Sequence, residues 1–68
     1  MKACVMIVVK GEGAGFDVIG EVCGRGGVVH EWDCDRGVIE ATVDAGDLGA
    51  LRKLGGVSYV RPVMCYAA

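Results

Sequence analysis

Seven consecutive apolar residues, Ala-Cys-Val-Met-Ile-Val-Val at positions 3–9, lie between Lys2 and Lys10. Successive side chains of a β-strand point to opposite faces of its sheet, so a strand with this sequence has two apolar faces. The chain has only 68 residues, which is near the lower limit for a domain with a single hydrophobic core. Helices from so short a chain are expected to cover one face of the sheet. The other face is then either a surface for a partner or a liability.

The composition indicates one globular domain, because 53% of the residues are hydrophobic and 24% are charged. The formal net charge is −2, and the Lys and Arg residues are scattered along the chain. Nucleic-acid binding needs grouped cations, so this function class is not supported. No apolar run reaches the roughly 20 residues that a transmembrane helix requires. Lys10 directly follows the apolar run without a convincing signal-peptide cleavage pattern, so a cytoplasmic location is the default expectation.

Hydrophobic periodicity and turn residues predict the order strand, helix, strand, strand, helix, strand over residues 1–68. The predicted strands are residues 2–10, 28–34, 38–43 and 57–60, and the predicted helices are residues 16–23 and the segment from the N-cap Asp44 to Leu54. Residues 11–15 are expected to form a flexible glycine-rich turn. This order predicts an α+β ferredoxin-like sandwich, a four-stranded antiparallel sheet of order 4-1-3-2 with both helices on one face.

The period-two alternation within the strands assigns their side chains to the two faces of the sheet. The residues expected to face the helices are Val5, Ile7, Val9, Ile39, Ala41 and Val43. The residues expected on the uncovered face are Cys4, Met6, Val8, Val38 and Thr42. For residues 28–34 two alternatives remain, since either Val28, His30 and Trp32 or Val29, Glu31 and Asp33 point outward. An exposed Trp is typical of interfaces, and Trp32 is therefore counted with the candidate interface residues.

The four cysteines are Cys4, Cys23, Cys34 and Cys65. An even number in a short secreted chain would indicate disulfides, but no secretion signal is evident, so reduced thiols are the default expectation. The predicted topology brings Cys4 close to Cys65 and separates Cys23 from Cys34. A framework of two disulfides does not suit this arrangement.

No motif predicts a cofactor, a metal ion or catalysis. The glycine pattern of residues 11–15 lacks the spacing of a dinucleotide-binding turn, and a glycine-rich connection is favoured. His30 and Cys34 are four strand residues apart, about 13 Å, which is too far for one metal ion. Glu31, Asp33, Asp35 and Glu40 are interpreted as a solvated hairpin tip rather than an acid–base pair. The chain is therefore not expected to be an enzyme.

Over residues 18–60 the sequence resembles the inhibitor and propeptide family of subtilisin-like serine proteases. The matching segments are Val18-Ile19, Gly26-Gly27-Val28-Val29, Val38-Ile39-Glu40-Ala41-Thr42-Val43, Leu48-x-x-Leu51 and Gly56-Val57-Ser58-Tyr59-Val60. Their spacing fits the family without gaps, and residues 3–10 fit its first strand. The resemblance implies the ferredoxin-like fold that the element order also predicts.

The resemblance also implies a mechanism of protease inhibition. In this family the open sheet face packs on surface helices of the protease, and the segment after the last strand lies in the substrate cleft like a cleaved product. The residues that would occupy the cleft by this analogy are Met64, Cys65, Tyr66, Ala67 and Ala68, with Ala68 in the primary specificity position. Attached propeptides also act as intramolecular chaperones, whereas free-standing members are inhibitors.

One departure from the family follows the last matching segment. The family usually carries acidic residues directly after Val-x-Tyr-Val, where this chain has Arg61-Pro62. Two further hypotheses remain beside the protease partner. The first is a self-assembly or regulatory module that forms a homodimer through the open sheet face. The second is thiol-based metal binding.

Overall fold

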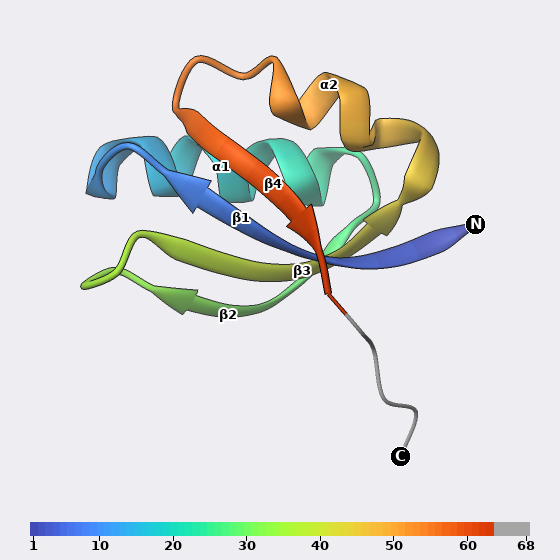
Figure 1. The fold of residues 1–68 in the computed structure, drawn as a ribbon, viewed down its shortest axis with the longest axis horizontal. Coiled ribbons are helices and arrows are strands. Elements are labelled where there is room, and N and C mark those ends of the chain that lie inside the picture. Colours follow the sequence, from blue (N-terminus) through green and yellow to red (C-terminus); the bar gives the residue numbers. More distant parts are fainter. Residues whose placement is uncertain (64–68) are drawn as a thin grey trace.

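The computed structural model describes residues 1–63 and has the predicted order of elements (Figure 1). The elements are β1 (Lys2–Val9), α1 (Glu12–Gly24), β2 (Val28–Asp33), β3 (Val38–Asp44), the 3-10 turn η1 (Ala45–Asp47), α2 (Leu48–Arg52) and β4 (Val57–Pro62). The strands form one antiparallel sheet of order β2-β3-β1-β4. This is the predicted order 4-1-3-2 read from the opposite edge, so the ferredoxin-like α+β fold is confirmed.

Strand β1 lies in the centre of the sheet, between β3 and β4. Ile7 is paired with Ile39 of β3 and Val60 of β4, and all three side chains are buried. The expected helix-facing set of β1 and β3 is buried as a whole, and it belongs to one core cluster with residues of α1, α2 and β4. Full burial of each such aliphatic side chain contributes about 1.5–3 kcal/mol. The inward half of the apolar run therefore holds the domain together.

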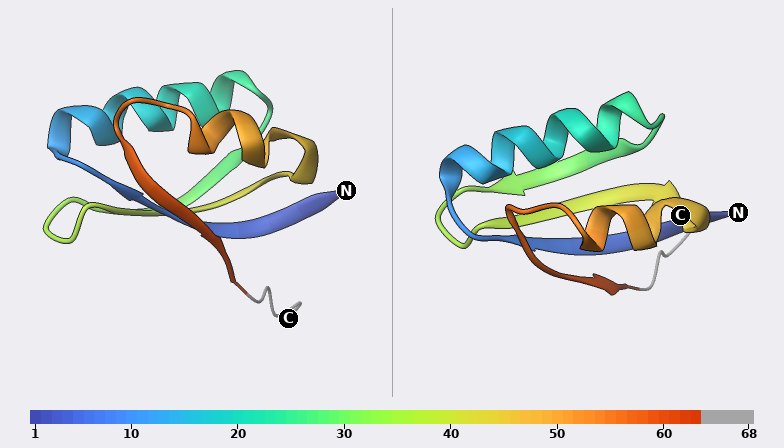
Figure 2. Two further views of the ribbon diagram at one scale, coloured as in Figure 1. Left: turned by 45° about the horizontal axis from the view of Figure 1, so that its top comes forward. Right: turned by 90° about the horizontal axis from the view of Figure 1, so that it is seen from above.

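Both helices lie on the same side of the sheet, as Figure 2 shows. Helix α1 begins at Glu12, earlier than predicted, and the backbone N–H of Gly15 already donates to the carbonyl oxygen of Gly11 at 3.0 Å. The prediction of a turn at residues 11–15 was wrong because glycine propensity disfavours a helix only weakly, and packing on the sheet overrides it. The predicted N-cap is confirmed, since the Asp44 carboxylate accepts from the Gly46 backbone N–H at 2.9 Å.

Strand β2 contains an irregularity in its pairing with β3. Val29 is opposite Ala41, whereas Glu31 is opposite Glu40, so His30 is one extra residue between them. A bulge of this kind shifts the alternation of side chains along a strand. Neither alternative for this strand therefore holds along its whole length: the outward residues are Val28, His30, Glu31 and Asp33.

Trp32 lies on the helix-covered side, which corrects its placement on the open sheet face. Its ring packs against the core and lies so close to Gly15 that a side chain at Gly15 would overlap it. The rings of Trp32 and Phe16 meet edge to face, with centroids 6.3 Å apart. The physical reason for the difference is the register from the β2–β3 turn, which pairs Trp32 with the inward-facing Ile39, while the bulge at His30 lets Val28 face outward as well.

Cys4 is disulfide-bonded, whereas Cys23 and Cys34 are free and exposed. The expectation of reduced thiols is therefore wrong for Cys4, because it rested on the absent secretion signal rather than on geometry. The backbone N–H of Val63 donates to the Cys4 carbonyl oxygen at 3.0 Å, so the chain leaving β4 passes beside this cysteine. The predicted proximity of Cys4 to Cys65 involves a residue outside the described part of the chain.

Candidate protein-interaction site

The sheet has one face that neither helix covers, which we call the open face (Figure 2). Its residues are Cys4, Met6 and Val8 of β1, Val38, Glu40 and Thr42 of β3, Val28, His30, Glu31 and Asp33 of β2, and Tyr59 and Arg61 of β4. Met6, Val8 and Val38 are half-buried, whereas Tyr59 is 52% and Val28 is 56% exposed. The outward half of the apolar run thus lies in a largely uncovered surface that both edge strands extend.

The strand registers align these residues in three rows across the open face. The middle row is Glu31, Glu40, Met6 and Arg61. The turn-side row, nearer the β2–β3 turn, is Asp33, Val38, Val8 and Tyr59. The third row is Val28, Thr42 and Cys4. In the middle and turn-side rows the acidic residues lie toward β2, whereas Arg61 of the middle row lies on β4.

Glu31 and Glu40 are directly opposite each other on neighbouring strands. A side-chain hydrogen bond with Glu40 raises the pKa of Glu31, and the charge of Glu40 adds to the effect, with smaller contributions from desolvation and Asp33. Like charges directly opposite in a sheet are destabilising. The two carboxyl groups therefore form an acidic position that a cation from outside the chain would stabilise.

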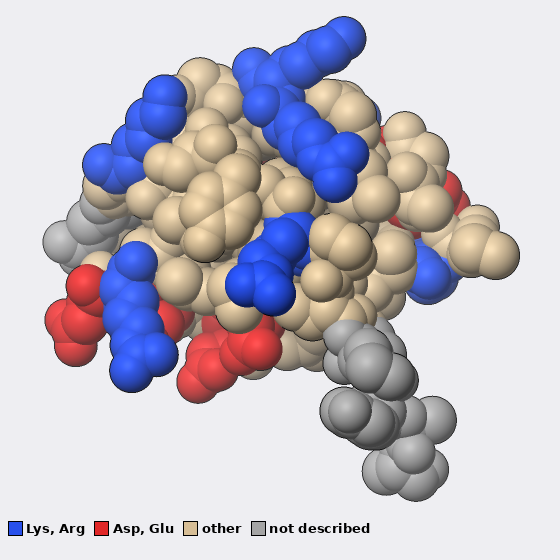
Figure 3. All heavy atoms as spheres, in the orientation of Figure 1, with Lys and Arg blue, Asp and Glu red and all other residues tan. Residues whose placement is uncertain are grey.

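The acidic pair adjoins a hollow of about 300 Å³ on the open face, lined by Met6, Glu31, Asp33, Arg36, Val38 and Glu40. Arg36 lies on its rim, where Nε is 3.8 Å from an Asp33 oxygen. The Arg36 backbone N–H also donates to the other Asp33 oxygen at 3.2 Å, which fixes the turn between β2 and β3. In Figure 3 one group of acidic side chains lies along the lower edge of the view, on the side of this hairpin, with basic side chains beside and above it, and further acidic side chains lie at the right edge.

A short polar chain crosses the open face near its third row. Thr42 Oγ1 lies 2.6 Å from His30 Nε2 and 3.5 Å from Cys4 Sγ. The Thr42 hydroxyl hydrogen-bonds His30 Nε2, whose tautomer sets the direction of this bond, and it also lies beside the Cys4 sulfur. The bulge thus gives His30 a defined hydrogen-bond partner on the open face.

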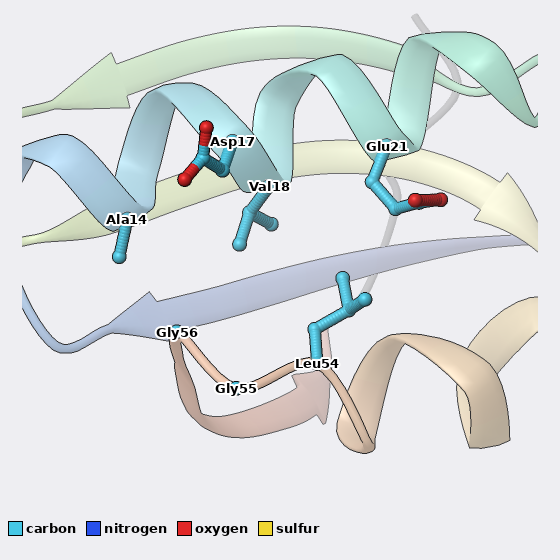
Figure 4. A pocket seen from close by; sticks show the side chains of 7 residues that line it. All are labelled: Ala14, Asp17, Val18, Glu21, Leu54, Gly55 and Gly56. Carbon is cyan, nitrogen blue, oxygen red and sulfur yellow. The ribbon is translucent and has the colours of Figure 1, made fainter.

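A second depression lies on the opposite side of the sheet, between α1 and the segment that joins α2 to β4 (Figure 4). It has a volume of about 240 Å³ and is lined by Ala14, Asp17, Val18, Glu21, Leu54, Gly55 and Gly56. The side chains of Val18 and Leu54 point toward each other across it. Glu21 at its rim is paired with Arg25, 3.4 Å away. This depression contains none of the residues predicted for the site.

The structure brings together five of the six predicted sheet-face residues, which are Cys4, Met6, Val8, Val38 and Thr42. Trp32 is on the other face, and the predicted tail, residues 64–68, lies outside the described residues. Sequence reasoning missed Tyr59 and Arg61 and assigned Glu31 and Glu40 to a solvated tip. These two glutamates are instead paired within the strands. Counting back from the turn, with Asp33 opposite Val38, would have placed Glu31 opposite Glu40, because the bulge lies beyond Glu31.

The described residues contain no group of three or more His, Cys, Asp or Glu side chains that could hold a metal ion. None of the helices within residues 1–63 is long and apolar enough to cross a membrane. The open face carries apolar side chains, the Glu31–Glu40 pair and Arg61.

Comparison with known proteins gives this chain no family: no family model matches it, and no curated protein matches it.

Proposed function

We propose that this chain is a small protein-binding domain that inhibits a subtilisin-like serine protease, or assists its folding, through its open face and its C-terminal tail. The observation that carries the proposal is the one-sided sheet, in which Met6, Val8 and Val38 lie outward on central strands with no helix over them. The choice of a protease as partner comes from the resemblance over residues 18–60. The role of residues 64–68 in the cleft comes from the resemblance alone.

The physical case for a protein partner is the exposed apolar side chains of the open face. Tyr59 extends the patch of Met6, Val8 and Val38 onto β4, and Val28 adds an exposed apolar side chain on β2, beside Thr42. Protease–inhibitor complexes bury about 800 Å² on each partner, and burial of apolar surface contributes about 25 cal/mol per Å². A contiguous apolar face with a polar rim is the usual anatomy of such an interface.

The departure at Arg61-Pro62 changes the expected contacts of this face. Arg61 lies opposite Met6 on the open face, so the acidic residues that the family places after the last strand are not available there. Glu31, Glu40 and Asp33 supply carboxylates from β2 and β3 instead. Carboxylates favour the N-terminal ends of helices, where backbone N–H groups are unpaired. We infer that these three residues contact the protease helices in this chain.

An inhibition titration with matched variants tests the proposal. Tyr59 is 52% exposed on the open face, and Phe16 is 61% exposed on the helix-covered side, so they form a pair of comparable exposed aromatics. Tyr59→Lys should weaken inhibition of an active subtilisin-like protease at least 10-fold, because it places a charge in the interface. Phe16→Lys should change inhibition less than 2-fold. No inhibition by micromolar wild-type chain, or equal losses for the two variants, would contradict the proposal.

A further inference from the structure

The geometry points to a second copy of this chain as an occupant of the open face. We propose that two copies stack open face to open face about a two-fold axis parallel to the strands, with Arg61 of each copy against Glu31 and Glu40 of the other. This inference goes beyond the proposed function and does not depend on it, because it rests on the arrangement of the middle and turn-side rows.

The strand order makes the open face self-complementary under this symmetry. The order β2-β3-β1-β4 has its midpoint between β3 and β1. A two-fold axis along the strands at this midpoint places β2 of one copy over β4 of the other, and β3 over β1. It leaves positions along the strands unchanged, so that each row faces its own reversed copy.

Reversal of the middle row places unlike charges together. Arg61 of one copy then faces Glu31 of the other, and the Glu31–Glu40 position receives a cation from the second copy. Among the described residues, Arg61 forms no ion pair, and neither do Glu31 and Glu40. A guanidinium can bond two carboxylate oxygens at once, which suits a closely spaced acidic pair.

The turn-side row is compatible with the same arrangement. In this row Val8 faces Val38 of the other copy, and the Tyr59 hydroxyl faces the Asp33 carboxylate. Stacked sheets lie about 10 Å apart and cross at about 30°, which displaces the edge strands by roughly 4 Å along their length. An arginine side chain spans this displacement.

The alternative two-fold axis, perpendicular to the strands, gives the opposite result. It places β2 over β2 and β4 over β4, so Glu31 meets Glu31 and Arg61 meets Arg61. The charges of the middle row therefore select one orientation of the two copies. Four strands of six to eight residues make an interface at the small end of stable ones. Because charge pairs orient the two copies, the dimer should weaken with added salt.

Sedimentation equilibrium of the whole chain, without any protease, tests this inference. The wild-type chain should show a monomer–dimer equilibrium, and Arg61→Glu or Glu31→Arg alone should lower the association constant at least 10-fold. An equimolar mixture of these two variants should recover association, because every cross-copy pair is then attractive. The double variant E31R/R61E should self-associate as the wild type does. Arg52→Glu, an exposed arginine at the end of α2, is the matched control and should change nothing.

Several results would overturn the inference. The wild type could stay monomeric at several hundred micromolar, or it could dimerise with no effect of Arg61→Glu. Failure of the mixture to associate while both variants keep the circular dichroism of the folded wild type would also exclude the proposed pairing. None of these results bears on protease inhibition, which is measured separately with Tyr59→Lys. If both proposals hold, the protease and the second copy compete for the same face.

Discussion

Truncation of two neighbouring side chains on β1 should have very different effects on the free energy of unfolding. Ile7 is fully buried between β3, β4 and the helices, whereas Met6 points to the open face and is half-buried. Ile7→Ala removes three buried carbons and leaves a cavity, which costs about 2–5 kcal/mol in cores of this kind. Met6→Ala leaves no enclosed cavity and should cost less than about 1 kcal/mol, because the lost surface was partly in water.

The size of the first effect is large for this domain. A chain of this length is expected to have a total stability of about 3–10 kcal/mol, so Ile7→Ala should remove a large part of it. Ile7→Val provides a milder measurement, with a cost of about 0.5–1.5 kcal/mol. A cost of 1 kcal/mol lowers the Tm of a small domain by about 4–8 °C.

Urea unfolding followed by tryptophan fluorescence measures these differences. Trp32 is the single tryptophan and packs against the core, so its emission reports the folded state of the sheet and α1 together. The extrapolated free energies of wild type, Ile7→Val, Ile7→Ala and Met6→Ala should fall in the order given by burial. Equal losses for Met6→Ala and Ile7→Ala would refute the division of β1 into a structural face and an open face.

Other consequences of the structure can be measured in the same unfolding assay. Gly15→Ala should destabilise the fold by about 1–3 kcal/mol, since its new side chain would overlap the Trp32 ring; Gly20→Ala on the same helix meets no atom within 4 Å and should stabilise by up to about 1 kcal/mol. Equal effects of the two would contradict the packing of α1. The pKa of Glu31 is raised in the folded state, so its contribution is present below the ordinary pKa of a glutamate and is lost as pH rises through the folded pKa. Glu31→Gln should remove this loss between acidic and neutral pH, and an unchanged pH profile would argue against the acidic pair. The pKa of Asp44 is lowered by the Gly46 backbone N–H and the N-terminal charge, so its stabilisation is present above its ordinary pKa and is lost as pH falls through the lowered value; Asp44→Asn should reduce the acid sensitivity.

Much of the fold follows from local patterns in the sequence. The alternation of Val5, Ile7 and Val9 against their neighbours fixes which half of β1 is buried, since one face of the sheet must meet the helices. The turn after Asp33 and the N-cap at Asp44 can each be recognised from a few consecutive residues, because both rest on local hydrogen bonds. The order of strands then follows from the element order and the preference for simple connections.

The features that sequence reasoning missed depend on contacts between distant segments. The bulge at His30 has no residue signature of its own, and it breaks the alternation between Val28 and Trp32, so that Val28 faces outward while the Trp32 ring lies over Gly15. Helix α1 starts within a glycine-rich segment because packing on the sheet outweighs the low helix propensity of glycine. The register of β4 with β1 places Arg61 in the same row as Glu31, and this alignment cannot be predicted from the residues around Arg61 alone.

Methyl NMR of the folded chain tests the central claim, that the open face is the binding surface, most directly. The methyl signals of Met6, Val8 and Val38 report the open face, and those of Val18 and Leu51 report the core beneath the helices. On addition of a subtilisin-like protease whose catalytic serine is replaced by alanine, we expect the first three signals to shift and the other two to stay unchanged. Shifts confined to Val18 and Leu51, with the open-face signals unmoved at saturating protease, would contradict the account.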